Sequence, residues 1–328
     1  MISKRKIFFR ADAGPELGYG HYIRSLALAD MLKHDYDCTM FTQTPTAYQL
    51  HEATEICPVV ALPSDYSKFD KFLEYLHGDE IVVLDNYFFS TDYQRAIKKK
   101  GCKLVCLDGM LTKHYVADIV LNQALGLSPK DFSIEAHTKV LTGLDYVLLR
   151  RPFYDECNNV SIRHAKNARL QVAISFGGAD PCHLLPVYTE LLSQMDCVET
   201  VYAIVGDAYE ASASIEKVQY VKNLSALQLV ELYRTIDVAV FPSSTILKEA
   251  LACRVPVISG YFVDNQIQTY NSYLAHQLIV GIGNFTKSNA SDQLRKELKS
   301  GMYLNAKPEC SGITADIPNK YVELFKAL

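Results

Sequence analysis

Short apolar runs alternate with amphipathic stretches along this chain, and the whole alternation occurs twice. The apolar runs have the length, β-branching and flanking turn residues of buried strands, and the stretches between them have helical spacing. Strands that alternate with helices favour parallel sheets covered on both faces and joined by right-handed crossovers. The sequence therefore predicts an α/β protein with two Rossmann-like domains that face each other across a cleft.

The two halves meet at a polar stretch, Cys157–Ala168, which is the expected linker. We predict an N-terminal domain over residues 1–157 and a C-terminal domain over residues 158–328. A final helix, Asn319–Leu328, is compatible with packing on either domain. The predicted strands are Lys6–Asp12, Cys38–Gln43, Ile81–Asn86, Lys103–Asp108, Ile119–Gln123, Leu170–Gly177, Thr200–Gly206, Val218–Lys222, Val238–Pro242 and Val255–Gly260. The predicted helices are His21–Leu32, Ala47–Ala53, Lys68–His77, Thr91–Lys100, Leu184–Met195, Ala226–Thr235, Thr245–Cys253 and Asn265–His276.

Composition restricts the possible partners and compartment. The 328 residues suit two domains, and a net charge of −4 offers no electrostatic footprint for nucleic acid. The nine cysteines contain no C-x-x-C pair and no metal-ligand spacing, so they are expected to be free thiols in a reducing cytosol. No signal peptide and no apolar run of membrane-spanning length is recognisable. We expect a cytoplasmic protein without metal or cofactor, and the sequence does not indicate an oligomeric state.

The first glycine-rich turn, Gly18-Tyr19-Gly20-His21, follows the first predicted strand and opens a helix. Gly18 and Gly20 permit positive φ angles and a close approach of the backbone to a ligand. In the first helical turn the dipole disfavours an imidazolium, so His21 is suited to act as a neutral general base. Arg24 shares the helical face of His21 and is suited to hold a carboxylate or phosphate. The alternatives are a histidine that only hydrogen-bonds a carbonyl and an ordinary surface arginine.

Two further segments predict a nucleotide site in the second half. Gly177 and Gly178 follow a strand without forming the G-x-G-x-x-G fingerprint of dinucleotide binding. Ser244 and Thr245 open a helix with hydroxyl groups and free N–H groups, which together suit a diphosphate. Glu249, one turn further along, is placed to accept from ribose hydroxyls. An ordinary Gly-Gly turn and a plain Ser/Thr cap are the alternative interpretations.

A fourth segment, Asp264-Asn265-Gln266, follows the last predicted strand and opens a helix. The Asn265 and Gln266 amides are suited to read sugar hydroxyl or N-acetyl groups, although Asp264 also suits a simple N-cap. All four segments lie at the carboxyl ends of predicted parallel strands. Ligands bind at that edge in open α/β sheets, so the four segments together indicate a ligand site.

The ordered set of motifs resembles the UDP-sugar hydrolases of pseudaminic acid biosynthesis. The resemblance spans residues 10 to about 275. It is carried by Arg10-Ala11-Asp12-Ala13, Gly18-x-Gly20-His21-x-x-Arg24, Asp85-Asn86-Tyr87, Gly143-Leu144-Asp145-Tyr146-Val147-Leu148-Leu149-Arg150, Ser175–Pro181, Ser243–Glu249 and Asn265-Gln266. These enzymes release UDP from UDP-2,4-diacetamido-2,4,6-trideoxy-β-L-altropyranose, and their fold is that of the B-type glycosyltransferases.

The resemblance implies a role for individual residues. His21 matches the catalytic base, and Tyr87 and Asn265 match substrate-contacting positions. The UDP side is matched by Gly177, Gly178, Ser244, Thr245 and Glu249, with Asn223 and Leu224 near the uracil. Two departures from the family pattern are Asp108-Gly109, where a pair of aspartates is common, and Cys253-Arg254-Val255-Pro256, where a glycine usually precedes the proline.

The expected reaction is hydrolysis of a UDP-linked amino-deoxy sugar with inversion at the anomeric carbon. UDP is a good leaving group, so one base and a well-bound diphosphate suffice, without the two carboxylates of ordinary glycoside hydrolysis. An inverting UDP-sugar glycosyltransferase of the same fold is the main alternative. A UDP-N-acetylglucosamine 2-epimerase and a non-catalytic nucleotide-sugar-binding protein are the others.

Overall fold

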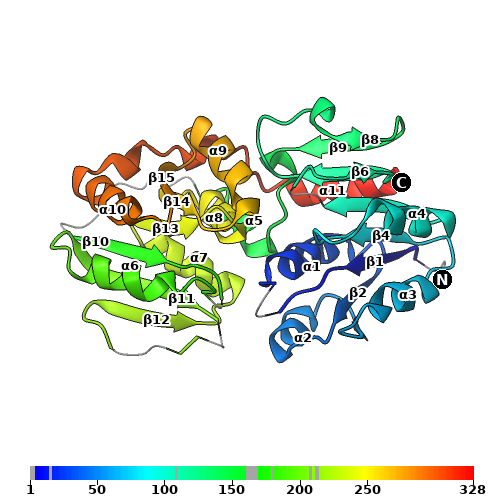
Figure 1. The fold of residues 1–328 in the computed structure, drawn as a ribbon, viewed down its shortest axis with the longest axis horizontal. Coiled ribbons are helices and arrows are strands. Elements are labelled where there is room, and N and C mark those ends of the chain that lie inside the picture. The colour runs from blue at the N-terminus through cyan, green and yellow to red at the C-terminus, as the bar shows by residue number, and fades with distance from the viewer. Residues whose placement is uncertain are drawn as a thin grey trace. The chain divides into compact units, whose positions relative to one another are not determined.

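The computed structural model describes residues 4–14, 17–107, 110–159, 169–178, 180–206, 209–210 and 214–328. The chain forms two compact units (Figure 1). One contains Met1–Arg151 together with Asp316–Leu328, and the other contains Pro152–Ala315. Asp108, Gly109 and most of the predicted linker lie outside the described residues.

The first unit is built on a parallel sheet with the strand order β3-β2-β1-β4-β5-β7-β9 among its described residues. The chain runs outward from β1 to β3, returns to pair β4 with the other side of β1, and then continues outward. This is the doubly wound order, and its direction reverses between β1 and β4. The strands are β1 (Lys6–Arg10), β2 (Asp37–Gln43), β3 (Val59–Leu62), β4 (Ile81–Leu84), β5 (Lys103–Leu107), β7 (Ile119–Asn122) and β9 (Lys139–Thr142); β6 (His114–Tyr115) pairs with β8 (Ser133–Ile134).

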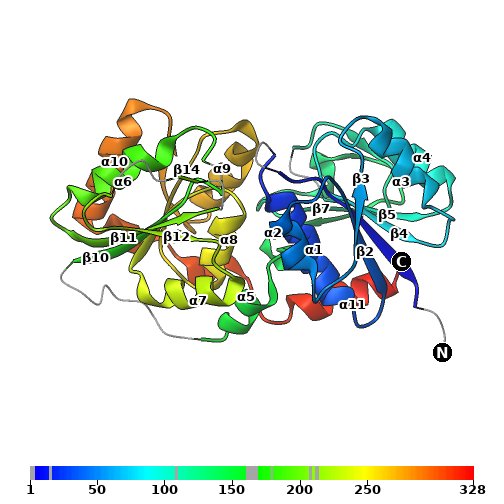
Figure 2. The same ribbon diagram turned by 90° about the horizontal axis from the view of Figure 1, so that it is seen from below.

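Helices cover both faces of this sheet (Figure 2). Phe72 of α3 and Ile97 of α4 pack on sheet residues that include Phe41, Val82 and Leu104. The turn before α2 is fixed by a capping box in which Thr46 and Gln49 bond each other's backbone. The helices are α1 (Gly20–Leu32), α2 (Ala47–Ala53), α3 (Ser67–Glu74), α4 (Thr91–Lys99) and α11 (Ile317–Lys326).

The second unit repeats this design with the strand order β12-β11-β10-β13-β14-β15, parallel throughout its described residues. Counted from β10, this is the order 3-2-1-4-5-6, and its reversal lies between β10 and β13. The strands are β10 (Leu170–Ile174), β11 (Val198–Val205), β12 (Val218–Lys222), β13 (Val238–Pro242), β14 (Val257–Tyr261) and β15 (Val280–Asn284). The helices are α5 (Arg151–Glu156), α6 (Leu184–Ser193), α7 (Ala226–Thr235), α8 (Thr245–Ala252), α9 (Ile267–Ala275) and α10 (Ser288–Ser300).

The boundary between the units differs from the predicted one. It lies at Arg151, not Cys157, because α5 is bonded to the second unit. Arg234 of α7 donates to Glu156 at 3.0 and 2.6 Å, and Arg254 donates to the Cys157 carbonyl at 3.1 Å. The final helix belongs to the first unit, where the Tyr321 hydroxyl donates to the Tyr146 carbonyl at 2.6 Å.

Three strands of the two large sheets were not predicted, and all three are edge strands. They are β3, β9 and β15. Their residues are only partly buried: β3 has one buried residue among four, and β15 reads Val-Gly-Ile-Gly-Asn. β9 and β15 lack the continuous apolar run that marks a strand buried on both faces, whereas β3 reads Val-Val-Ala-Leu and is only four residues long. The helix α10 and the short helix α5 were missed as well.

A fully buried ion pair closes the end of β1. Arg10 and Asp12 have no exposed surface, and the two terminal guanidinium nitrogens of Arg10 donate to the Asp12 carboxylate. Lys68 donates to Asp12 at 2.9 Å, and the Gln43 backbone donates to it at 2.8 Å. Burial alone would raise the pKa of Asp12, but the bonds from Arg10, Lys68 and Gln43 hold it below its usual value. Asp12 is therefore the charge that balances two cations beside the sheet.

We predict that Asp12→Ala destabilises the protein severely, because it leaves the Arg10 guanidinium buried without its counter-ion. The loss in unfolding free energy should be roughly 3–5 kcal/mol, measured by urea denaturation. The matched control is Asp92→Ala, since Asp92 pairs with Arg95 at 2.9 Å on the exposed surface. That variant should lose at most about 1 kcal/mol. Equal losses in both variants would contradict this account of Asp12.

Candidate active site

The carboxyl ends of β1 and β4 bring together a histidine, an arginine and a buried aspartate. His21 Nδ1 lies 2.6 Å from Asp85 Oδ1, and Arg24 Nε donates to Asp85 Oδ2 at 2.5 Å. Arg24 Nη2 also bonds Asp85 Oδ1, and the Ser25 hydroxyl donates to Oδ2 at 3.2 Å. Asp85 is fully buried, whereas the side chains of His21 and Arg24 are 11% and 13% exposed. Asp85 therefore holds the two residues that the sequence analysis singled out on α1.

The protonation state of Asp85 sets the orientation of the histidine. Burial would raise the pKa of Asp85, but the charges of Arg24 and His21 and their hydrogen bonds bring it down to about 2. The carboxylate is thus ionised and can only accept, so Nδ1 of His21 carries its proton toward Asp85. In the neutral ring the lone pair is then on Nε2. A base oriented by a carboxylate is the arrangement used to take a proton from water or a hydroxyl group.

Backbone geometry places His21 at this point. Gly18 has a φ of +72° and exchanges backbone bonds with Gly14, which closes the turn before the helix. Gly20, expected to permit a positive φ, is instead the first residue of α1 and is helical. His21 is the second residue of α1, and no side-chain cap or acidic residue occupies the first turn. The prediction that His21 lies at a helix N-terminus is confirmed.

The ring of Tyr87 packs beside the ring of His21. Its ring lies 4.7 Å from the His21 ring in an edge-to-face arrangement, and Tyr87 is 39% exposed. Between Asp85 and Tyr87, the Asn86 side chain donates to the Asp12 carbonyl at 3.1 Å and accepts from the Asp12 N–H at 2.6 Å. Asn86 thus links the ends of β1 and β4, where the order of the strands reverses. Doubly wound sheets bind ligands at this point.

The glycine turn of the second unit follows β10 and packs against the end of β11. Gly178 accepts a bond from the Gly206 N–H at 3.0 Å, and a side chain on Gly206 would meet the Gly178 carbonyl at 2.8 Å. The helix that follows is not an open anion site. The Asp180 carboxylate accepts from the N–H groups of Leu184 and Leu185 at 3.0 and 2.8 Å, so α6 already has its own anion. The Gly177–Gly178 turn therefore leads to a helix whose first N–H groups are already bonded within the protein.

The start of α8 is open by comparison. Ser244 is its N-cap and makes no side-chain capping bond, and its first turn has no acidic residue. The neighbouring Ser243 hydroxyl bonds Ser259 at 3.0 Å, which fixes the end of β13 against β14. Ser244 and Thr245 are half-buried, and Glu249 is buried. Among the predicted UDP residues, Ser244 and Thr245 therefore offer an uncapped helix N-terminus beside the strand reversal at β10 and β13.

The remaining predicted residues follow other strands of the same sheet. Asn223, with a φ of +49°, is exposed directly after β12, and Leu224 is half-buried beside it. Asn265 is half-buried in a short 3-10 turn before α9. Gln266 is buried, and its side-chain oxygen accepts from the Phe262 N–H at 3.0 Å. Gln266 thus closes the local turn, so its side-chain oxygen is already used within the protein.

The structure gathers the predicted residues into two groups, one in each unit. The first unit holds Gly20, His21, Arg24 and Tyr87. The second unit holds Gly177, Gly178, Asn223, Leu224, Ser244, Thr245, Glu249, Asn265 and Gln266 along the carboxyl edge of its sheet. The sequence analysis names Asp85 only as part of the Asp85-Asn86-Tyr87 motif and does not predict it as a site residue. Its signal was present, because it is a carboxylate directly after the fully buried strand β4.

The described residues contain neither a cluster of metal-ligand side chains nor a membrane-spanning helix. In the part of the chain that the structure describes, no group of three His, Cys, Asp or Glu side chains is arranged to hold a metal ion. Within the same ranges, no helix combines the length and apolarity needed to cross a membrane.

Comparison with known proteins finds distant relatives. No family model matches the chain. An uncharacterized protein of Methanocaldococcus jannaschii is 25% identical over 284 residues, covering 82% of this chain and 58% of that protein. The UDP-2,4-diacetamido-2,4,6-trideoxy-beta-L-altropyranose hydrolase of Campylobacter jejuni is 23% identical over 274 residues, covering 80% and 94%. The spore coat polysaccharide biosynthesis protein SpsG of Bacillus subtilis is 22% identical over 284 residues, covering 83% and 82%.

Solved structures identify the fold. MurG of Acinetobacter baumannii matches with a TM-score of 0.65 at 14% identity over 99% of this chain and 100% of that one. The calicheamicin glycosyltransferase CalG4 matches with a TM-score of 0.65 at 11% identity, covering 99% and 98%. The chain has the B-type glycosyltransferase fold. HepE of Anabaena, solved with UDP-glucose, shares it with a TM-score of 0.61 at 13% identity, covering 98% and 100%. The predicted α/β class with two parallel-sheet domains is confirmed.

We predict that the stabilising effect of Asp85 disappears in acid. Its pKa in the fold, about 2, lies below the ordinary aspartate value of about 3.9. Its contribution is therefore complete above about pH 5 and is lost as the pH falls toward 2. Asp85→Asn should lower the unfolding free energy by about 2–3 kcal/mol near neutral pH, and the difference from wild type should shrink between about pH 5 and pH 3. Urea denaturation across this range, with Asp92→Asn as the exposed control, measures it. A difference independent of pH would show that the Asp85 charge is not the cause.

Proposed function

We propose that this protein hydrolyses a UDP-linked amino-deoxy sugar to free sugar and UDP, with inversion at the anomeric carbon. The observation that carries the proposal is the His21–Asp85 contact of 2.6 Å at the strand reversal of the first sheet, with Arg24 on the same carboxylate. The Campylobacter relative is named as a hydrolase of such a UDP-sugar. We infer that the free sugar feeds nonulosonic acid or surface glycan synthesis in the cytoplasm.

In this mechanism His21 acts on water. Nε2 takes one proton from a water molecule whose oxygen attacks the anomeric carbon on the face opposite UDP. The bond from that carbon to the diphosphate oxygen breaks, and UDP leaves with the electron pair. Asp85 remains ionised, keeps the ring in the productive orientation and stabilises the imidazolium that forms.

The second unit supplies the leaving-group site. The uncapped N-terminus of α8, with the hydroxyl groups of Ser244 and Thr245, stabilises the charge that develops on the diphosphate. Glu249 accepts from the ribose hydroxyls, Gly177 and Gly178 allow close approach of the backbone, and the uracil lies near Asn223 and Leu224. Gly20, Arg24, Tyr87, Asn265 and Gln266 are proposed to contact the sugar.

A glycosyltransferase is the second candidate, because the chain shares its fold with MurG and CalG4. The same His21–Asp85 pair can deprotonate an acceptor hydroxyl instead of water. The two functions are separated by incubating the protein with a panel of UDP-sugars, with and without sugar acceptors, and measuring UDP and free sugar. Hydrolysis predicts equal amounts of UDP and free sugar without an acceptor. Turnover only in the presence of an acceptor would establish the transferase instead.

We predict that His21→Asn slows hydrolysis by roughly 10²- to 10⁴-fold, because asparagine keeps a hydrogen-bonding group but cannot act as the base. UDP affinity, measured by calorimetry, should barely change, because the proposed nucleotide residues are in the other unit. The matched control is His77→Asn, since His77 is exposed and lies before the amino end of β4, whereas Asp85 follows the carboxyl end of that strand. Unchanged turnover in His21→Asn would place the base elsewhere.

We predict that Glu249→Ala weakens UDP binding by roughly 1.5–3 kcal/mol, through the loss of charge-assisted bonds to the ribose. Calorimetric titration with UDP measures the change directly. Glu231→Ala, at an exposed glutamate of α7, is the control and should leave the affinity unaltered. Because Glu249 is buried, circular dichroism must first show that the variant is folded. A folded variant with normal UDP affinity removes Glu249 from the site.

A further inference from the structure

We propose that Lys113 is a positioning residue of the active site, which holds the segment Tyr87–Phe89 so that the Tyr87 ring stays against His21. Lys113 has no place in the motifs of the sequence analysis. The inference rests on the proposed function for its effect on turnover, but the contact that it describes can be tested without turnover.

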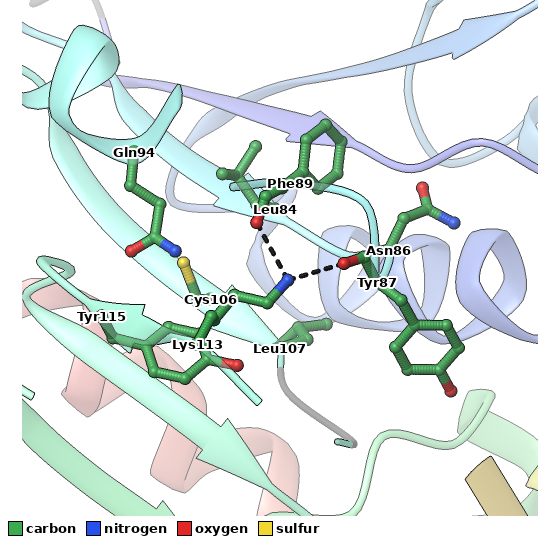
Figure 3. Close-up of a pocket in the computed structure, with 9 residues that line it drawn as sticks. All are labelled: Leu84, Asn86, Tyr87, Phe89, Gln94, Cys106, Leu107, Lys113 and Tyr115. Carbon is green, nitrogen blue, oxygen red and sulfur yellow. Dashed lines mark hydrogen bonds between the residues drawn. The ribbon is translucent and has the colours of Figure 1, made fainter. Parts of the chain in front are cut away.

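The ammonium group of Lys113 binds two backbone carbonyls of the segment that follows β4 (Figure 3). Lys113 Nζ donates to the backbone carbonyl oxygen of Tyr87 at 2.7 Å and to that of Phe89 at 2.9 Å. Hydrogen bonds from a charged donor are stronger than neutral ones. Lys113 comes from the connection between β5 and β6, so it joins two loops that are separate in the sequence.

The rest of the segment shows why this clamp matters. Asn86 is fixed on one side by its two bonds to Asp12, and Phe89 is buried on the other side. Tyr87 and Phe88 between them are each 39% exposed. Tyr87 is thus held indirectly through its neighbours in the chain. The bond from Lys113 holds the Tyr87 carbonyl directly.

The space around Lys113 argues against a ligand site at the lysine itself. The cavity beside it, lined by residues that include Gln94, Cys106 and Tyr115, has a volume of about 10 Å³. That is at the lower limit for one water molecule and far too small for a sugar. In Figure 3 the Tyr87 side chain points away from Lys113, so the lysine acts on the backbone while the ring is left to face His21.

The contact is tested by NMR of the histidine rings. The ring of Tyr87 lies edge-to-face with His21 at 4.7 Å, so its ring current shifts the His21 proton signals. With ¹³C-labelled histidine, the His21 signal is identified by its absence in His21→Asn. Lys113→Met keeps the apolar stem but lacks the donors, and it should move the His21 signal in the direction seen in Tyr87→Leu. Lys113→Arg keeps the charge and should retain the wild-type signal, as should Lys130→Met at an exposed lysine of the same unit.

Kinetics test the consequence. Lys113→Met should lower kcat by roughly 10- to 100-fold, since small misplacements of catalytic groups have effects of this size. Lys113→Arg should restore most of the rate, and UDP affinity should be unchanged in both. A His21 signal unmoved in Lys113→Met overturns the clamp, and a moved signal with unchanged kcat overturns its role in positioning. A wild-type protein that cleaves no UDP-sugar contradicts the proposed function, whereas the NMR result still decides whether Lys113 holds Tyr87.

Discussion

The arrangement of the active site depends on one ionised carboxylate, that of Asp85. It is fully buried, and an unpaired charge in that position would be strongly destabilising. Arg24, His21 and Ser25 all reach it from the first turns of α1. The same bonds that make the burial of Asp85 tolerable therefore fix the rotation of α1 and the orientation of the histidine ring. Stability and the proposed chemistry share a single interaction here.

The buried pair of Arg10 and Asp12 extends this constraint to the neighbouring strand. Asn86 links the two sites, because it follows Asp85 in the chain and bonds both backbone groups of Asp12. The ends of β1 and β4 are thereby joined by polar bonds at the point where the sheet order reverses. The connections that follow the two strands leave in opposite directions there, which makes room for a ligand, and a charge network holds the ends of both strands in place.

Two helices of the second unit, α6 and α8, begin differently. In the second unit Asp180 neutralises the start of α6, whereas α8 begins without a side-chain cap. A helix whose N–H groups are already bonded has little left for a diphosphate, and an uncapped one retains that capacity. We infer that the proposed leaving-group site is at α8 for this reason, although both helices follow strands with suitable residues.

The sequence by itself determined the fold class, the strands buried on both faces and the position of His21 at a helix start, because each depends on a local pattern of apolar residues, glycines and turns. It did not show the edge strands β3, β9 and β15, which are four or five residues long and only partly buried. Polar or glycine residues interrupt the apolar pattern of β9 and β15, whereas β3 is apolar throughout but short. Only the tertiary structure decided which carboxylate orients His21 and that α11 joins the first unit. These contacts bring together residues up to 175 positions apart, such as Tyr146 and Tyr321, and no local pattern specifies the partner of a side chain at such a separation.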